Sequence, residues 1–352
     1  MANANLILSR VSEEELAATE LYHCHAESHL PFALALCLVF ITFGVPGNLT
    51  TILALAWDKK VKNVTAIFII NLHISNLMIC IIILPLTAAA LAQNHWTYGK
   101  AMCVLYAHLR FMLATSSILS ILAITITRFI LVCFPFSYSK ICNRKNVSII
   151  ILLIWVLSLT MYTPYYFGAL SGFGLDANQG FCTIIYEKYG GILYLSFGYV
   201  LPIIILTICY INIWWTATKA KNKLRNKNLV RNNSTRSTFR PIFNNDSSRS
   251  GDSGMSTPKD ETSVPGENRL EAAFKVAKKA DRVKAPTKRD QRLFTMILAI
   301  IIAYSFVQLP INLSYCINPI IYVFMSKEYR QAYSNLFRMI MHKLQRNSHH
   351  FR

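Results

Sequence analysis

Long runs without a charged residue limit what this chain can fold into more than any other feature. Five runs contain no Asp, Glu, Lys or Arg: residues 31–57, 63–99, 146–175, 189–218 and 293–326. A sixth apolar stretch, residues 101–136, is interrupted only by Arg110 and Arg128. About 20 apolar residues cross the hydrocarbon core of a bilayer as a helix, and core helices of soluble proteins rarely repeat such lengths. We therefore expect an all-α membrane protein.

The positions of the cations predict the orientation of these spans. The chain has 36 Lys and Arg against 17 Asp and Glu, and all but four of the cations fall on one side of the expected membrane. The four exceptions are Arg10, Lys100, Arg110 and Lys188. Because cytoplasmic connections carry the excess of Lys and Arg, we expect the N-terminus outside. A nucleic-acid-binding protein is the other class with such a positive charge, and the apolar spans disfavour it.

Composition divides the chain into five expected parts. Residues 1–30 form an extracellular N-terminus, and residues 31–218 carry five spans. Residues 219–292 form a long basic third cytoplasmic loop, and its Ser-, Thr-, Asn- and Gly-rich middle cannot bury enough apolar surface to fold. Residues 293–325 contain the last apolar run. Residues 326–352 have apolar positions at helical spacing between cations, which predicts an amphipathic helix in the inner headgroup layer.

One charged residue and two cysteines stand out on and near the third span. Arg128 lies at its cytoplasmic end, in Thr127-Arg128-Phe129. A charge on a membrane helix is unfavourable unless it reaches water or a partner, so Arg128 is a functional candidate, and a headgroup anchor is the alternative. Cys103 at the outer end and Cys182 in the next outer loop both face an oxidising compartment, where a disulfide is compatible with their positions. Two separate thiols are the alternative.

Further motifs follow in a fixed order along the spans. They are Gly47-Asn48, Leu84-Pro85, Trp96-Thr97-Tyr98-Gly99, Trp155 with Pro164, Pro202 with Tyr210, Leu309-Pro310 and Asn318-Pro319-Ile320-Ile321-Tyr322. Together with Cys103, Arg128 and Pro135, they resemble the rhodopsin-like (class A) G-protein-coupled receptors over residues 31–218 and 288–340. The stretch SYCINPIIYVFMSKEYRQAY is similar to the invertebrate orphan branch of Moody and Trapped-in-endoderm, which is itself similar to melatonin-type receptors.

The resemblance implies a seven-transmembrane-helix bundle in the plasma membrane. Such a receptor transmits an extracellular ligand signal to heterotrimeric G proteins, with arrestin as a further expected partner. It is not an enzyme, and it needs no cofactor or metal. The residues expected to act in activation and G-protein coupling are Thr127, Arg128, Phe129, Pro135, Tyr210, Asn318, Pro319 and Tyr322. The helix-core motif residues are Asn48, Asn76, Trp155, Pro202, Gln308 and Pro310.

Three positions depart from the pattern of that family. Asn76 stands where an aspartate is usual, and a neutral amide predicts weak or absent sodium coupling. Thr127 replaces the usual acid before Arg128, which removes one restraint on the arginine and predicts raised basal activity. Gln308 occupies the position of a common tryptophan, two residues before Pro310.

The largest departure is a missing stretch. Only eight residues separate Pro310 from Pro319, where the family has the end of helix six, an outer loop and the start of helix seven. Residues 293–325 would extend only about 50 Å as one helix, so two crossings and a turn do not fit. We expect helix six to be fused to a truncated helix seven. The alternative function is a non-signalling isoform that acts by pairing with full-length receptor or is retained in the endoplasmic reticulum.

Arg110 suggests the ligand class. It lies seven residues, or two helical turns, after Cys103, on a face that the resemblance directs into the ligand cavity. An intramembrane cation there favours an anionic or lipid-like ligand. The alternative is an arginine that reaches the outer headgroups or a local carbonyl. The sequence contains no HExxH, P-loop or G-x-S-x-G motif, which disfavours the common enzyme classes.

Overall fold

The computed structural model describes residues 5–7, 11–21, 29–58, 64–167, 172–177, 179–185, 196–237, 319 and 327–350. Four residues predicted for function lie outside these ranges: Gln308, Pro310, Asn318 and Tyr322. Most of the third loop and nearly all of the last apolar run also lie outside them. The chain divides into two units, Met1–Asn212 with Lys288–Arg352 and Ile213–Thr287.

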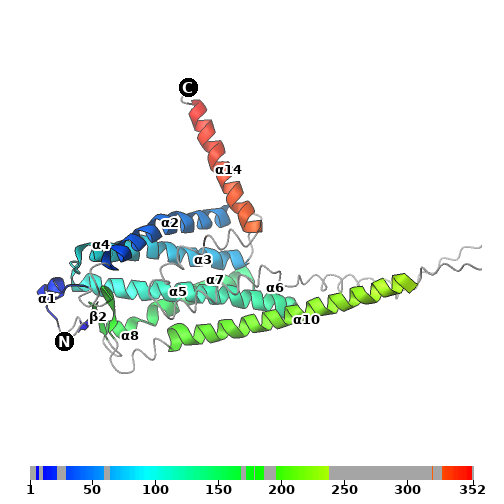
Figure 1. Cartoon of the computed structure of the whole chain (residues 1–352), viewed down its shortest axis with the longest axis horizontal. Helices are drawn as coiled ribbons and strands as arrows, with labels where there is room; N and C mark the ends of the chain where they lie inside the picture. The colour runs from blue at the N-terminus through cyan, green and yellow to red at the C-terminus, as the bar shows by residue number, and fades with distance from the viewer. Residues whose placement is uncertain are drawn as a thin grey trace, which may run out of the picture. The chain divides into compact units, whose positions relative to one another are not determined.

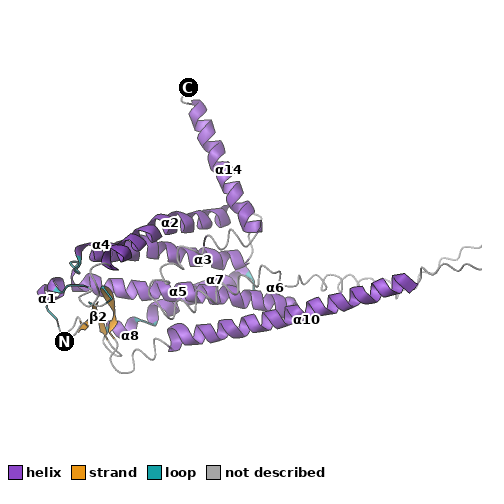
Figure 2. Ribbon diagram, in the orientation of Figure 1, coloured by secondary structure: helices purple, strands orange, loops and turns teal. Residues whose placement is uncertain are grey.

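Helices dominate the described chain (Figures 1 and 2). The α-helices are α1 (Glu13–Ala18), α2 (His29–Trp57), α3 (Val64–Met78), α4 (Leu84–Gln93), α5 (Gly99–Cys133), α6 (Pro135–Ile141), α7 (Arg144–Thr160), α8 (Thr163–Tyr166), α10 (Leu201–Ser237) and α14 (Lys327–His350). Two π-helical turns, η2 (Ile79–Ile83) and η3 (Ser196–Val200), precede α4 and α10. The strands are β1 (Asn5–Ile7), β2 (Gly172–Asp176) and β3 (Phe181–Ile185).

Four helical segments in the described chain are long and apolar enough to cross a membrane. They are Pro31–Trp57, Val64–Gln93, Gly99–Cys133 and Arg144–Tyr166. Leu201–Thr216 is a shorter apolar helix at the expected position of the fifth span. Large apolar side chains such as Leu152 and Leu157 of α7 are exposed. A surface of this kind suits lipid as the solvent, and the prediction of membrane helices is confirmed for the described part.

Helices α2, α3 and α5 lie side by side, and α7 packs on α3 and α5 (Figure 1). The π-helical turn η2 in the second span ends two residues before Pro85, which removes a backbone donor at the start of α4. Asn94 then ends α4 in the left-handed conformation, with φ 55°. The side chain of Asn143 accepts a hydrogen bond from the Asn146 amide and caps the first turn of α7.

A three-stranded antiparallel sheet, in the order β1-β2-β3, lies at the Cys103 end of α5. We call this end the disulfide end, and the opposite end of α5 the Arg128 end. Residues 11–21, including α1, follow β1, and we call them the N-terminal strap. Its side chains Val11, Leu16 and Leu21 are buried in the same apolar cluster as Trp96 and Cys103. The all-α expectation therefore holds for the spans, while the sheet and the packed strap were not predicted.

Helix α14 packs against α2. Ala332 and Leu336 are buried with Ala54 and Leu55 of α2, and the Tyr333 hydroxyl hydrogen-bonds the Thr51 hydroxyl. The Asn335 amide also donates to the Asp58 carboxylate, 3.2 Å away. Phe337, Ile340 and Met341 remain exposed on the same helix. The amphipathic helix that the sequence indicates is present, with one face on α2.

Candidate functional site

The predicted cysteine pair forms a disulfide. Cys103, in the second turn of α5, is joined to Cys182 of β3, with 5.4 Å between their Cα atoms. Both cysteines are fully buried. Because 79 positions separate them in sequence, the bond ties the β2–β3 hairpin to the end of the third span.

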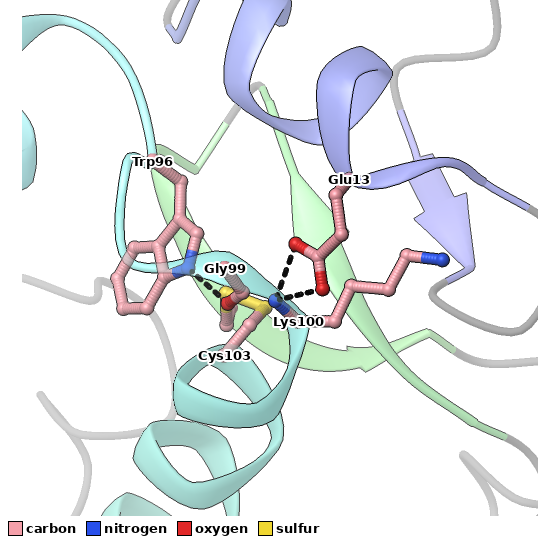
Figure 3. The surroundings of a disulfide bond; sticks show 6 residues. Glu13, Trp96, Gly99, Lys100 and Cys103 are labelled. Atoms are coloured by element: carbon pink, nitrogen blue, oxygen red, sulfur yellow. Dashed lines mark hydrogen bonds between the residues drawn. A yellow bond between two sulfur atoms is a disulfide. The ribbon is translucent and has the colours of Figure 1, made fainter.

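The N-terminal strap caps the same end of α5 (Figure 3). Both carboxylate oxygens of Glu13 accept hydrogen bonds from the Lys100 amide, at 3.0 and 3.3 Å. An acid is favourable there because the first amides of a helix lack partners and carry partial positive charge. The indole of Trp96 donates to the Gly99 carbonyl at 3.0 Å, and Gly99 has a φ of +75°, which glycine adopts without strain. The strap, Trp96 in the loop between α4 and α5, and the disulfide thus meet on the first turns of α5.

Arg110 lies one layer deeper, beneath the hairpin. Its guanidinium carbon is 3.8 Å from the ring centroid of Phe181, the β3 residue that precedes the disulfide cysteine Cys182. Nη1 of Arg110 is buried and finds no hydrogen-bond partner among the described residues. The guanidinium therefore packs against an aromatic ring, and the N–H groups of Nη1 could donate to an acceptor.

A polar network crosses the middle of the helices. The Trp155 indole donates to the Asn71 carbonyl oxygen at 2.9 Å, and the Asn71 amide donates to Ser120 at 2.8 Å. These bonds connect α7, α3 and α5. In α2, the Asn48 amide donates to the Gly44 carbonyl, and the Asn48 oxygen lies 2.7 Å from Nδ1 of His73. Sequence reasoning selected Asn48 and Trp155 but missed their partners, although a histidine inside a span is itself a signal.

Asn76 makes a neutral bond between α3 and α5. Its oxygen accepts a hydrogen bond from the Ser117 hydroxyl at 2.9 Å, and its side chain is fully buried. On the preceding residue, the Ser75 hydroxyl lies 2.9 Å from that of Ser116. Hydroxyls and an amide therefore line this contact. Weak sodium coupling remains a prediction.

At the Arg128 end, the Thr127 side chain makes a hydrogen bond within its own helix. Its hydroxyl donates to the Ala123 carbonyl of its own helix at 2.7 Å. Two residues earlier, the Thr125 hydroxyl donates to the Tyr210 hydroxyl of α10 at 3.3 Å, so that the predicted residue Tyr210 contacts α5 near Arg128. Arg128 itself is partly buried.

The remaining predicted residues occupy different places. Phe129 makes an edge-to-face contact with Phe134, with 5.7 Å between the ring centroids. Pro135 is exposed at the start of α6, and Pro202 is buried at the start of α10. Pro319 is buried against α2, where a Cβ added to Gly47 would lie 3.2 Å from its Cγ. The close approach explains why glycine precedes Asn48.

Comparison with known proteins identifies the family. The family model described as 7 transmembrane receptor (rhodopsin family) matches residues 47–344. This chain belongs to the rhodopsin family of seven-transmembrane receptors. The match includes Asn48, the disulfide, Arg128 and most of α14, and it confirms the family that the motifs resemble.

Relatives with this receptor fold fall in the expected branch. The G-protein coupled receptor moody of Drosophila pseudoobscura pseudoobscura is 30% identical over 88% of this chain and 53% of its own length. Protein trapped in endoderm-1 of Drosophila melanogaster is 34% identical over 61% of this chain and 55% of its own length. Melatonin receptor type 1C of Gallus gallus is 30% identical over 54% of this chain and 55% of its own length. The chain spans about half the length of these relatives.

Proposed function

We propose that this chain is a G-protein-coupled receptor of the plasma membrane, with its N-terminus outside and its Arg128 end in the cytoplasm. The observation that carries the proposal is the family match over residues 47–344. Within that stretch, Arg128 and Tyr210 lie on neighbouring helices at one end, and the disulfide lies at the other. The moody relative is itself named a G-protein coupled receptor. A heterotrimeric G protein is the proposed cytoplasmic partner, and arrestin would bind the same end.

We also infer an anionic, lipid-like ligand that binds at Arg110. A cation in a site of low dielectric strongly favours a negative partner and repels an amine. The Phe181 ring lies against the guanidinium, while the buried Nη1 has no acceptor among the described residues. A carboxylate or phosphate headgroup would supply that acceptor with a charge-assisted hydrogen bond. The apolar surroundings of Arg110, including Phe111 and Tyr106, would suit an acyl chain.

Nucleotide exchange on a co-expressed G protein tests both proposals. The probes are oleic acid and an oleoyl lysophosphatidic acid, with monooleoylglycerol as the neutral control. We expect Arg110→Gln to lower potency about 10- to 100-fold, the usual effect of losing a hydrogen bond to a charged group. Arg110→Lys keeps the charge but loses the guanidinium group, so its potency should lie between that of the parent and that of Arg110→Gln. Lys100→Gln is the matched control, because Lys100 uses its backbone amide in the strap contact.

Three results would separate these proposals. Unchanged potency in Arg110→Gln would exclude Arg110 as the ligand contact and leave the receptor function in place. An epitope near Ser250 that antibodies reach on intact cells would contradict the proposed orientation. Agonist-independent nucleotide exchange in the parent chain would support receptor function whatever the ligand.

The short distance from Pro310 to Pro319 supports a second candidate function, a non-signalling isoform. Replacing this segment with the longer segment of a moody-type relative restores the missing part. If only the restored chain activates a G protein, and the parent chain lowers surface levels of the restored chain on co-expression, the isoform acts by pairing. Equal activation by the two chains would exclude this function.

A further inference from the structure

Two cysteines bracket α6 and differ from the other described cysteines. Cys133 is the last residue of α5, and Cys142 follows the last residue of α6. Both are partly exposed, whereas Cys37, Cys80 and Cys209 are buried. The remaining described cysteines form the disulfide at the other end of α5.

The segment between the two cysteines presents an apolar surface. Phe134, Phe136 and Ile141 are 54%, 76% and 45% exposed, and α6 has no buried residue. A helix of seven residues is not stable in water without packing. Lys140 lies in its last turn, and Arg144 begins the next helix. Exposed aromatic and aliphatic side chains beside cations are the composition of segments that lie in an anionic headgroup layer.

Under the proposed orientation, helix lengths are compatible with a position of both cysteines near the inner membrane boundary. From Cys103 to Cys133 the helix α5 rises about 45 Å at 1.5 Å per residue, while the hydrocarbon core is about 30 Å thick. One end of this stretch therefore extends into the headgroup region. Cys142 lies two residues before the span Arg144–Tyr166. A thiol at this depth can hold an acyl chain that inserts directly into the bilayer.

We propose that Cys133 and Cys142 are S-acylated by long-chain fatty acids, which holds α6 flat against the inner leaflet. In the reaction, the cysteine Sγ attacks the carbonyl carbon of a fatty acyl-coenzyme A thioester. A new thioester forms at the cysteine, the bond to coenzyme A breaks, and the coenzyme A thiolate leaves and takes up the proton of the cysteine thiol. The proposal rests on the membrane orientation proposed above, because the acyl donor is cytosolic.

The protonation state of Cys142 bears on how the acyl transfer occurs. Burial raises the pKa of the Cys142 thiol, so that little thiolate is present at neutral pH. The thiolate is the nucleophile, so the transfer at Cys142 requires an acyltransferase that removes the thiol proton. Membrane attachment does not depend on the acyl chains, since the spans already supply it. Their effect is on the orientation of α6 and on the access of soluble proteins to it.

Exchange of thioester-bound acyl groups for a maleimide mass tag tests the proposal on the full chain in cells. Free thiols are blocked first, and hydroxylamine then cleaves thioesters. We expect two hydroxylamine-dependent tags in the parent chain, one in Cys133→Ser or Cys142→Ser, and none in the double variant. Cys209→Ser is the matched control and should keep two tags. In inside-out vesicles, trypsin should cleave after Lys140 several-fold faster in the double variant.

Three outcomes would overturn the proposal. The absence of hydroxylamine-dependent tags would show that neither cysteine is acylated. A protein partner would then be the alternative occupant of the apolar surface of α6. Tags that persist in the double variant would assign acylation to other cysteines. Labelling of Cys142 by a membrane-impermeant maleimide on intact cells would place α6 outside, in which case the proposed orientation fails along with the acylation.

Discussion

The N-terminal strap provides the sharpest test of the structure, because a single leucine carries much of its apolar contact. Leu16 is 0% exposed and packs in the cluster that includes Trp96 and Cys103. Truncation of a fully buried leucine to alanine costs about 2–5 kcal/mol. The strap is short and terminal, so we expect Leu16→Ala to loosen it locally while the spans stay folded. A loss of about 2 kcal/mol corresponds to a roughly 30-fold larger open population of the strap.

Hydrogen exchange of the full-length protein in lipid nanodiscs measures this opening. The Leu21 amide, which donates to the Asn94 carbonyl at 3.0 Å, reports on the docked strap. Its exchange should accelerate about 30-fold in Leu16→Ala, while amides of α3 should keep their rates. Glu14→Ala changes an exposed residue of the same helix and should alter exchange by about twofold at most. Equal exchange of Leu21 in Leu16→Ala and the parent would refute the docked strap.

Three further substitutions test the interior and the Arg128 end. Trp155→Phe removes the donor to Asn71 and should lower stability by about 1 kcal/mol, seen as a drop of a few degrees in the thermal midpoint; an unshifted midpoint would contradict the bond. Gly47→Leu forces a side chain into Pro319 and should cost about 1–3 kcal/mol, measured as reduced thermal stability. Thr127→Asp supplies the missing acid and should lower basal nucleotide exchange about fivefold or more; no drop would count against raised basal activity in the parent.

The membrane spans were predictable because lipid imposes a simple rule on sequence. A helix that crosses the hydrocarbon core must be apolar over its whole length, so its extent can be counted directly. The disulfide was predictable for a related reason, since orientation places Cys103 and Cys182 in the same compartment. Both inferences depend on position along one axis, and the charge pattern determines that axis.

The sheet and the strap could not be predicted in the same way. β1 pairs with β2 across more than 160 positions of sequence, and none of the three strands has a clear alternation of polar and apolar residues. The strap has three glutamates in one turn, which suggests a solvated segment, although Leu16 directly after them is fully buried. The three buried apolar residues of the strap, Val11, Leu16 and Leu21, do not indicate in sequence which part of the chain they pack against. The partner, Trp96, lies in a loop after the second span.

The helix-core motifs were predictable only in part. Sequence reasoning selected Trp155 and Asn48, but the polar contacts depend on the rotation of each helix about its axis. Asn71 and His73 are two residues apart on α3 and reach different helices, Asn71 toward α7 and His73 toward α2. A hydropathy pattern with little amphipathic character does not specify that rotation. Neutral hydrogen bonds between helices supply it, which is why buried polar residues recur along α3.

The contacts along α5 are distributed unequally, and this bears on where a signal can travel. At the disulfide end, the covalent bond, the Glu13 cap and the packing of Arg110 on Phe181 converge within three turns of helix. At the Arg128 end, the described contacts include a long hydrogen bond of 3.3 Å to Tyr210 and a helix α6 without a buried residue. Elements that move are drawn from parts of a protein with few buried contacts. A ligand at the proposed Arg110 site would act beside the covalently tied end of α5, whereas α6 at the other end has no buried residue to restrain it.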